Sequence, residues 1–477
     1  MNEWQDAHAW AAAEFGAAPL PDRRSRQRLV EAAAALAQRP EGSLPQHFDW
    51  AELKGLYRLV HQAADDPALL QQAHRDRTRA RMTRDEPVLI IHDTTQLDFT
   101  AHKAARDQLG PVGDHGGCGF IQHNSLAVDA AGRAVLGLVY QQTFAREQAP
   151  AGETRAQRQR RAARESAVWA RGIRGAGPAP AGACWVDVCD RAADFFEPMA
   201  VARLLGHHFL IRLCQDRRAR RPAAGGAPAG ALTHLLRAAR ALEPVVSDTV
   251  AVASKGGRPA RQARVQLAGT RLRVEPPLRD PKWRGHPPLA VTVVRVWEPE
   301  PPPGQQALEW VLGTDLPAPT AADLLRLRDW YARRWPTAED YHKALKTGLG
   351  VERLRFETAG RLLAAVALLS VVAARVLDLR RRRDAVPEAD AATVATAQEI
   401  DLVRKASKHR GGPMTVQAFV DGVAKLGGYL GRRGDGPPGW QTLWRGYQRL
   451  ADMLLGIVLL TAADPQEGDL PRLTESG

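Results

Sequence analysis

Two short apolar runs that lead into aspartates constrain the fold of this 477-residue chain more than any other feature. A single residue, His92, separates the run 88–91 from Asp93, and Asp190 directly follows the run 184–189. Apolar runs of this length, bounded by turn residues, are typical of buried β-strands. Because neighbouring strands lie about 4.8 Å apart, carboxylates at matched strand ends can meet. The pattern therefore predicts a sheet with an acidic pair at the ends of two strands.

The segments around these runs predict the architecture. Apolar runs at 125–128 and 134–140 follow the first aspartate, and a helical stretch around 165–173 precedes the second. Three consecutive strands, a helix and a strand that can lie beside the first indicate a mixed α/β sheet. Residues 206–316 are predicted to form a β-rich insertion, and helices return from residue 321. Its expected strands are 209–213, 249–253, 263–267, 270–274, 289–297 and 308–312.

The two ends of the chain are predicted to be helical domains. We expect a polar helical domain at 1–80, an α/β domain at 81–383 and, after a charged linker, a small helical domain within 384–477. The last domain carries one apolar helical stripe, which packs in a core or forms a dimer contact. The stripe consists of Trp440, Leu443, Trp444, Tyr447, Leu450, Ala451 and Leu454.

Bulk composition limits the class of protein. A formal charge of +13 and a pI near 10 suit a polyanionic partner, although a basic enzyme with solvated arginine faces has the same charge. The spacing of the four cysteines indicates neither a zinc site nor a disulfide framework. The apolar stretch 362–374 is shorter than the roughly 20 residues that span a bilayer, so we expect a buried helix and no membrane partner. The first residues do not resemble a signal peptide.

A basic helix carries a third acid. Tyr331 and Arg334 are three residues apart, and Glu339 and Lys346 are seven apart, so each pair shares a helix face, and Lys343 lies near Glu339. Such a face presents a carboxylate to a metal and cations to phosphates, although a salt-bridged surface helix is the alternative. Carboxylate oxygens suit hard cations, and two Mg²⁺ or Mn²⁺ ions about 3.5–4 Å apart promote in-line phosphoryl displacement. Three separated acids alone would be weak evidence, but two aspartates at strand ends together with a glutamate on a basic helix predict a two-metal site for phosphodiester chemistry on DNA or RNA.

Several motifs follow one another in an order that resembles a known family. The chain is similar over nearly its whole length to bacterial insertion-sequence DDE transposases of the cut-and-paste type, which carry a Tyr-Arg-Glu-Lys helix signature. The matching pieces are His92-Asp93-Thr94-Thr95, Val188-Cys189-Asp190-Arg191-Ala192-Ala193-Asp194 and His342-Lys343-Ala344-Leu345-Lys346-Thr347-Gly348, followed by Glu352-Arg353, Leu426-Gly427-Gly428-Tyr429 and the helix from Trp440 to Trp444.

The resemblance implies an RNase H-like catalytic core with a β insertion, an N-terminal domain that binds DNA ends and a C-terminal dimerisation domain. It implies a Mg²⁺-dependent nuclease and strand transferase that nicks, forms and resolves a hairpin, and joins the end to target DNA. The partners would be double-stranded DNA, namely terminal inverted repeats and target, and a second copy of the chain in a homodimer. We expect a cytoplasmic location at the bacterial nucleoid.

By residue, the resemblance assigns the two metal ions to Asp93, Asp190 and Glu339. Trp310 would stack on a flipped base, and a buried strand tryptophan is the alternative for it. The remaining residues implied to contact DNA are Tyr331, Arg334, Lys343, Lys346 and Arg212. Independently of the resemblance, four arginines crowd the start of the first clear helix and favour phosphate contact, or form a solvated face. They are Arg23, Arg24, Arg26 and Arg28.

The helix signature departs from the family pattern at one point. Four residues rather than three separate Arg334 from the next glutamate. Counting from Arg334 puts Ala338 in the catalytic place, whereas counting back from Lys343 puts Glu339 there. We assign Glu339, and expect a helix that restarts at Pro336, or a π-bulge, to absorb the extra residue. Without either, the chain is a catalytically damaged or domesticated relative that acts as a DNA-binding protein. An RNase H-like nuclease or resolvase is the third interpretation.

Overall fold

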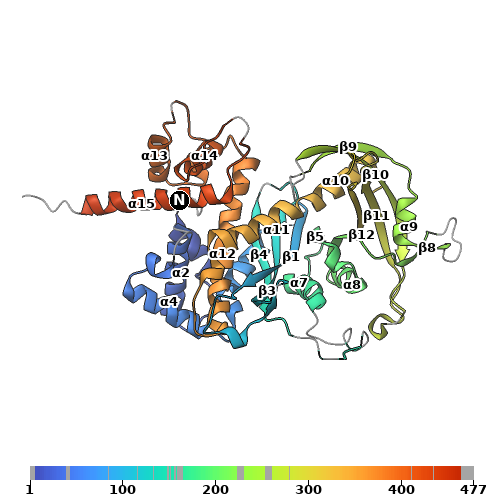
Figure 1. Cartoon of the computed structure of the whole chain (residues 1–477), viewed down its shortest axis with the longest axis horizontal. Helices are drawn as coiled ribbons and strands as arrows, with labels where there is room; N and C mark the ends of the chain where they lie inside the picture. Colours follow the sequence, from blue (N-terminus) through green and yellow to red (C-terminus); the bar gives the residue numbers. More distant parts are fainter. Residues whose placement is uncertain are drawn as a thin grey trace, which may run out of the picture. The chain divides into compact units, whose positions relative to one another are not determined.

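The computed structural model of the protein describes residues 6–38, 43–83, 85–114, 116–132, 134–147, 150, 152–154, 157, 165–222, 230–252, 260–278, 280–409, 411–432 and 435–462. The chain forms two compact units (Figure 1). We call residues 71–342 and 355–363 the sheet unit, and residues 1–70, 343–354 and 364–477 the terminal unit. This division into units does not test the predicted domain boundaries at 80 and 384, which remain predictions.

A single mixed sheet organises the sheet unit. Its strand order is β2-β3-β1-β5-β6-β12-β11-β10-β7-β8, with β4 paired to β3 and β9 paired to β10. The described strands are β1 (Val88–Asp98), β2 (Gly110–Val112), β3 (Gly117–Asp129), β4 (Val135–Phe144), β5 (Trp185–Cys189), β6 (His208–Arg212), β7 (Arg218–Arg220), β8 (Leu232–His234), β9 (Val246–Val252), β10 (Arg261–Val274), β11 (Leu289–Trp297) and β12 (Glu309–Thr314).

The first part of this sheet confirms the predicted order. Strands β1, β3 and β4 are antiparallel neighbours, and the helix α7 (Val168–Ala176) leads from β4 into β5. Strand β5 then pairs in parallel with β1, where Ile90 lies opposite Asp187. The apolar runs form these strands because both faces of the sheet are covered here: residues 88–92 of β1 and all five residues of β5 are buried. The fold class, a mixed α/β sheet with helical regions at both ends of the chain, is confirmed.

The predicted β-rich insertion continues the same sheet. Strand β12 pairs antiparallel with β6, so Leu312 lies opposite Arg212. Two strands expected at 263–267 and 270–274 form the single strand β10, because its ladder with β11 runs unbroken through Gly269. A Cβ at Gly269 would lie 2.7 Å from the side chain of Leu324 in α10 (Ala321–Ala332). The glycine is therefore required for close packing of this helix and does not mark a turn.

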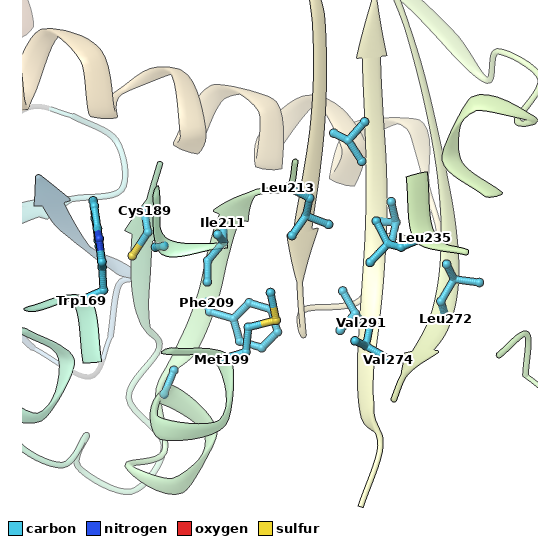
Figure 2. Close-up of a cluster of buried hydrophobic side chains, with 14 of the residues drawn as sticks. Trp169, Cys189, Met199, Phe209, Ile211, Leu213, Leu235, Leu272, Val274 and Val291 are labelled. Carbon is cyan, nitrogen blue, oxygen red and sulfur yellow. The ribbon is translucent and has the colours of Figure 1, made fainter. Parts of the chain in front are cut away.

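A large apolar core lies against the middle of the sheet (Figure 2). The cluster includes Phe209 of β6 and Val291 of β11, together with Trp169 of α7 and Met199 of α8 (Phe196–Leu204). The short helix α9 (Leu235–Arg240) contributes Leu235. One cluster thus spans the strands next to the second aspartate and the strands of the insertion, which makes them one packing unit.

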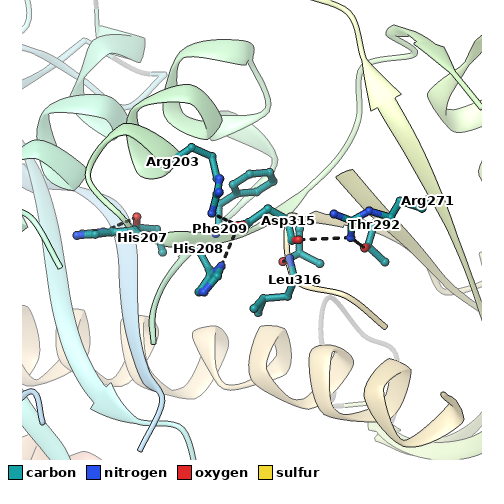
Figure 3. A network of polar contacts seen from close by, with 10 residues as sticks. Arg203, His207, His208, Phe209, Arg271, Thr292, Asp315 and Leu316 are labelled. Carbon is teal, nitrogen blue, oxygen red and sulfur yellow. Dashed lines mark hydrogen bonds and ion pairs between the residues drawn. The ribbon is translucent and has the colours of Figure 1, made fainter. Parts of the chain in front are cut away.

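A polar network closes the junction between β6 and the insertion (Figure 3). Asp315 follows β12, and its carboxylate accepts hydrogen bonds from Arg203 Nη1 at 2.7 Å and from the Phe209 main-chain N–H at 3.0 Å. His208 Nδ1 lies 2.8 Å from the same carboxylate, whose side chain is 7% exposed. The main-chain oxygen of Asp315 accepts a hydrogen bond from Arg271 at 3.5 Å. The network therefore ties α8, β6, β10 and β12 together.

The terminal unit is helical. Its N-terminal helices are α1 (Ala7–Phe15), α2 (Arg23–Gln38), α3 (Leu44–His47) and α4 (Trp50–Gln62), and its C-terminal helices are α13 (Ala397–Ala406), α14 (Val416–Leu426) and α15 (Trp440–Ala462). Capping boxes start α4 at Asp49 and α13 at Thr396, where side chains satisfy the first main-chain N–H groups. The helix α5 (Gln72–Arg81), predicted within the N-terminal domain, instead packs on β4 in the sheet unit.

The helix α12 (Ala359–Ala385) contains the apolar stretch noted in the sequence. The helix has 27 residues and extends beyond that stretch, so by length and composition it could cross a membrane. The prediction that this segment is too short to span a bilayer was therefore wrong. Its most apolar segment is 89% buried within the protein, as expected of a core helix.

The apolar stripe of α15 packs into the C-terminal core of its own chain. Trp444 is 2% exposed and Leu450 is 1% exposed. Leu443 and Leu450 join the buried cluster of α13 and α14, and a Cβ at Gly348 would lie 2.0 Å from the Trp444 ring. Of the two interpretations of the stripe, a core role is confirmed. The sequence left both open, because the spacing of an apolar stripe does not show whether its partner helix belongs to the same chain or to another.

The replacement Trp444→Ala is therefore expected to lower the free energy of unfolding by about 3–5 kcal/mol, the usual cost of truncating a buried tryptophan. Urea unfolding followed by fluorescence measures this loss. Leu455→Ala, on the same helix but 45% exposed, is the matched control and should change stability by less than about 0.5 kcal/mol. Unchanged stability of Trp444→Ala, with loss of self-association, would return the stripe to the status of an interface.

Candidate active site

Asp93 is the first partly exposed side chain of β1 after its buried segment. Its side chain is 19% exposed, and Arg334 Nη1 lies 3.0 Å from its Oδ2 atom. Its Oδ1 atom accepts a hydrogen bond from the Thr94 main-chain N–H at 2.9 Å. A guanidinium therefore neutralises this carboxylate directly.

Asp190 follows β5, the strand that runs parallel to β1. It caps the short 3₁₀ turn Arg191–Ala193, and its Oδ1 atom accepts a hydrogen bond from the Ala192 main-chain N–H at 2.7 Å. The next strand, β6, ends its pairing with β5 where Ile211 meets Cys189. Asp190 thus stands just beyond the paired part of the sheet.

The electrostatics of the two aspartates are linked. Burial raises the pKa of Asp93 above its ordinary value, and Arg334 and the hydrogen bond from Thr94 offset this only in part. Burial also raises the pKa of Asp190; the bond from Ala192 and the charge of Arg334 oppose this, and the charge of Asp93 adds to it. A carboxylate whose pKa is raised by a second carboxylate, with one guanidinium beside them, forms a site that favours added positive charge. The structure brings Asp93, Asp190 and Arg334 together.

Aromatic side chains extend from this group. Tyr331, at the end of α10, is fully buried, and burial raises its pKa although Arg334 and Arg212 lower it. Its ring meets Trp310 of β12 edge to face, with centroids 5.6 Å apart. Trp335 stacks on Trp310 with centroids 6.2 Å apart and 19° between the planes, and the Arg334 guanidinium lies 4.8 Å from the centre of the Trp335 ring. Trp335 was missed in the sequence, where its only signal is its place directly after Arg334.

Two further residues complete the surroundings of the pair. Asn124 lies opposite Asp93 on β3, and its amide is held by Gln141 at 2.7 Å and lies 3.2 Å from His342 Nε2. Arg212, at the end of β6, donates to the Glu309 main-chain oxygen at 3.2 Å. No sequence pattern indicated Asn124, because its place depends on the cross-strand register.

The structure does not bring Glu339 to the aspartate pair. The helix α11 (Arg334–Lys343) is continuous from Arg334 to Glu339, so the two side chains lie about 140° apart on an ideal helix. Arg334, Ala338 and Tyr341 are buried, whereas Glu339 is exposed. The predicted restart at Pro336 was wrong: the helix begins two residues earlier, and a π-helix occurs only later, at Ala344–Gly348. Within the described parts of the chain, no three His, Cys, Asp or Glu side chains form a group that could hold a metal ion.

The two lysines of the signature belong to the terminal unit. Lys343 is the exposed last residue of α11. Lys346 lies in the π-helix, and its Nζ atom is 3.0 Å from Glu352 Oε1. In that position Lys346 forms an ion pair within its own unit.

The donor set at the aspartate pair fits a hard divalent cation in part. Asp93 and Asp190 offer only oxygen atoms, and their raised pKa values reflect carboxylates whose burial is not fully compensated. The third carboxylate of the predicted set lies on the exposed face of α11. The residues present fit metal binding by a pair of carboxylates.

A buried charged network lies one residue before Asp93 and three before Asp190. His92 Nε2 and His207 Nδ1 each lie 2.9 Å from an oxygen of Asp187, and all three side chains are fully buried. Ser125 Oγ contacts the other nitrogen of His92 at 2.9 Å. Because these residues come from β1, β3, β5 and the start of β6, the network holds the strands that carry the two aspartates.

In the terminal unit, a basic depression of about 610 Å³ lies between α2 and α4. Three of the four predicted arginines line it, namely Arg23, Arg24 and Arg28, together with Arg58 and His61 of α4. Arg26 instead donates to the Leu20 main-chain oxygen at 3.0 Å. The depression gathers cations that are about thirty residues apart in the sequence.

Comparisons with known proteins match both ends of the chain. Residues 7–64 match the family described as transposase DNA-binding, and residues 371–462 match the family described as transposase Tn5 dimerisation domain. A solved structure of the piggyBac transposase synaptic complex with hairpin DNA aligns with 94% of this chain and 77% of that chain, at 8% identity and a TM-score of 0.34. That TM-score is too low to indicate a shared fold. Both matched segments lie in the terminal unit.

Proposed function

We propose that the protein is a DNA transposase that binds transposon ends as a homodimer, cuts them and joins them to target DNA. The observation that carries the proposal is the pair of strand-end carboxylates, Asp93 and Asp190, next to Arg334, in a chain whose two ends match transposase DNA-binding and dimerisation domains. A nuclease or resolvase would not require those two end domains. Among such transposases, the motifs of this chain most closely resemble those of the transposase of the kanamycin-resistance composite transposon.

The chemistry at the pair follows from its residues. Asp93 and Asp190 would hold Mg²⁺ or Mn²⁺, which supplies an activated oxygen nucleophile and stabilises charge at phosphorus. Arg334 keeps the carboxylates ionised until a cation or a phosphate arrives, because a guanidinium binds both carboxylates and phosphates. The strand order β4-β3-β1-β5-β6, with its first three strands antiparallel and the last two added in parallel, supports the RNase H-like assignment of this core.

The proposed reaction course is a hydrolytic nick, hairpin formation, hairpin opening and strand transfer. Water breaks the first phosphodiester bond and leaves a 3′-OH. That hydroxyl attacks the opposite strand, a second water opens the hairpin, and the freed 3′-OH attacks target DNA. Each step is an in-line displacement by a hydroxyl or water at phosphorus, so one site can serve all four.

A second candidate function rests on the register of α11. The buried helix face that carries Arg334 presents Ala338, and Glu339 points to the opposite, exposed side. Without a third carboxylate, the chain would be a catalytically damaged or domesticated transposase that binds DNA ends and does not cut them. If the protein does cut DNA, Glu339 is proposed as the third metal ligand.

Nicking of a labelled transposon-end duplex in Mg²⁺ separates the two functions. If the wild-type protein nicks, Glu339→Ala is expected to abolish nicking, and the adjacent acid serves as control through Asp340→Asn, which should remain active. Wild-type-like nicking by Glu339→Ala would overturn the assignment of Glu339. A wild-type protein that binds the end but does not nick, and gains nicking through Ala338→Glu, would establish the damaged form.

Trp310 is proposed to stack on a base extruded during hairpin formation. Its ring is half-buried and already stacked on Trp335. Stacking on an aromatic face contributes about 1–3 kcal/mol per base, so Trp310→Ala should slow hairpin formation about 5- to 150-fold more than the first nick. Denaturing gels that follow both products measure this ratio. Trp297→Ala, which removes a half-buried tryptophan from the neighbouring strand, should slow neither step selectively.

The basic depression of the terminal unit is proposed to bind the phosphates of the transposon end. Phosphate contacts release counterions, so binding should weaken steeply as salt rises. The double change Arg24→Ala with Arg28→Ala should flatten the slope of log affinity against log salt by about two units. Arg26→Ala is the matched control, since its guanidinium bonds the Leu20 oxygen. An equal effect of Arg26→Ala would show that the depression is not the binding site.

A further inference from the structure

Asp194 closes the turn that carries Asp190. The turn makes few bonds of its own: Ala193 N–H donates to the Asp190 oxygen at 3.2 Å, and Asp194 N–H donates to the Arg191 oxygen at 3.2 Å. The sheet pairing of β5 stops at Cys189, opposite Ile211, and Figure 2 shows these two residues on neighbouring strands. Asp190 therefore lies on a segment that the sheet itself does not hold.

The carboxylate of Asp194 binds the loop after β6. Its Oδ2 atom accepts hydrogen bonds from the main-chain N–H groups of Cys214 at 2.5 Å and Gln215 at 2.7 Å. The Arg217 guanidinium bonds both its Oδ1 atom and its main-chain oxygen. The Asp194 side chain is fully buried and that of Arg217 is 17% exposed. Charge-assisted bonds of this kind are stronger than neutral ones. The Cys214 thiol adds a weaker contact to the Arg191 main-chain oxygen at 3.5 Å, so the Asp194 carboxylate makes the strongest bonds between the two loops.

We propose that Asp194 is a positioning residue for metal binding: its bonds to the loop 214–217 fix the turn 190–194 and so set the place of the Asp190 carboxylate. The inference rests on the proposed function, because it concerns how the aspartate pair holds its cation. Residues that hold a metal ligand in place typically change metal affinity or activity about 10- to 100-fold when they are replaced. The same loop follows Arg212 by one residue, so the tether also links Asp190 to the end of β6.

The chemistry of the contact determines the informative replacement. Asparagine at 194 keeps the shape but loses the charge, and its amide cannot face both the main-chain donors and the guanidinium with an oxygen. Lysine at 217 keeps one cation and loses the forked contact. Asp194→Asn is thus expected to loosen the turn, and Arg217→Lys to loosen it less.

The matched control is another buried ion pair of the sheet unit. The Glu298 side chain is 3% exposed, close to the fully buried side chain of Asp194, and it accepts two guanidinium contacts from Arg261 and a hydrogen bond from the Leu308 main-chain N–H. It directly follows β11, which β6 and β12 separate from β5 in the strand order. Glu298→Gln removes a comparable contact and should leave the turn unchanged.

The test uses the full-length protein and Mn²⁺ alone. Mn²⁺ binding is titrated by electron paramagnetic resonance, and hydrogen exchange is followed in a peptide covering residues 189–195. Asp194→Asn is expected to weaken Mn²⁺ binding about 10- to 100-fold and to speed exchange in that peptide, with a smaller change for Arg217→Lys and none for Glu298→Gln. Unchanged Mn²⁺ affinity in a folded Asp194→Asn protein, or an equal loss in Glu298→Gln, would overturn the proposal.

The outcome also separates this inference from the proposed function. If the wild-type protein binds no Mn²⁺ at all, metal-dependent cleavage fails, and the exchange data alone decide whether Asp194 holds the turn. Normal exchange in Asp194→Asn would then reject the tether as well. Strong Mn²⁺ binding that is indifferent to Asp194 would leave the metal site intact and reject only the positioning role.

Discussion

Alanine in place of Asp93 or Asp190 is expected to reduce DNA nicking more than about 100-fold, while binding of the transposon end is retained. Even partners that only orient a metal ligand cost up to about 100-fold when removed, and a ligand itself should cost more. End binding should persist because the basic depression lies in the terminal unit and the aspartates lie in the sheet unit. Rates of nicking under saturating protein, and affinities from gel shifts, measure the two quantities separately.

The matched control is Asp98, which lies at the exposed end of β1 and bonds Thr100. Asp98→Ala removes an acid from the same strand and should leave nicking within about threefold, since surface substitutions rarely exceed 0.5 kcal/mol. Nicking by Asp93→Ala or Asp190→Ala within tenfold of the wild type would show that the acidic pair is not the cleavage site.

The replacement Asp187→Ala is expected to cost about 3–5 kcal/mol of folding free energy, because it leaves two buried histidines without the carboxylate that holds both. Asp187 is fully buried, and each of its oxygens contacts a histidine nitrogen at 2.9 Å. Urea unfolding at neutral pH measures the loss. Glu165→Ala breaks the much more exposed pair with Arg146 and should cost less than about 1 kcal/mol. Equal losses in the two proteins would mean that the buried network contributes no more than a surface pair.

The same network predicts a pH dependence of stability. Burial alone would lower the pKa of His207, but the charge and hydrogen bond of Asp187 raise it above the ordinary 6.5. Burial alone would raise the pKa of Asp187, but His207 and His92 hold it below the ordinary 3.8. The contribution of His207 is therefore complete below pH 6.5 and is lost as the pH rises through its folded pKa. The contribution of Asp187 is complete above pH 3.8 and is lost as the pH falls through its own.

The cost of His207→Gln should consequently be larger at about pH 5.5 than at about pH 8.5. Urea unfolding of both proteins at each pH gives the two differences. Burial and the nearby charges of His92 and Arg171 hold the pKa of His123 well below 6.5, so its effect on stability has the opposite sign. His123 is present in both proteins, so its contribution cancels when their stabilities are compared. An equal cost at both pH values would contradict a raised pKa for His207.

The strands around the aspartates could be predicted because their signal is local. A continuous run of apolar residues such as 88–91 is stable only when every residue is buried. A strand that is covered on both faces of its sheet meets this condition, and few other structures of this length do. The neighbouring aspartates then lie at the strand ends whatever packs above them. The order of strands, helix and strand followed from the same reasoning, since a parallel neighbour of β1 requires a crossover connection.

Residues that act across the fold could not be found in the same way. Asn124 faces Asp93 only through the register of β1 and β3, and Trp335 enters the site only because Trp310 of a distant strand stacks on it. The stripe of α15 has the same spacing whether its partner belongs to its own chain or to another. These contacts depend on which surfaces meet, and periodicity carries no information about the identity of a partner surface.

The sequence by itself determined the mixed α/β sheet, the strand-end aspartates and the basic helix with Arg334, because local apolar patterns and charge are sufficient for each. Only the tertiary structure decided that Arg334 contacts Asp93, that Ala338 shares the buried face of α11 and that Glu339 is exposed. A helix turns 100° per residue, so one added residue between Arg334 and Glu339 rotates every later side chain. Which face is buried is then settled by packing against the sheet, a contact between segments more than 200 residues apart in the chain.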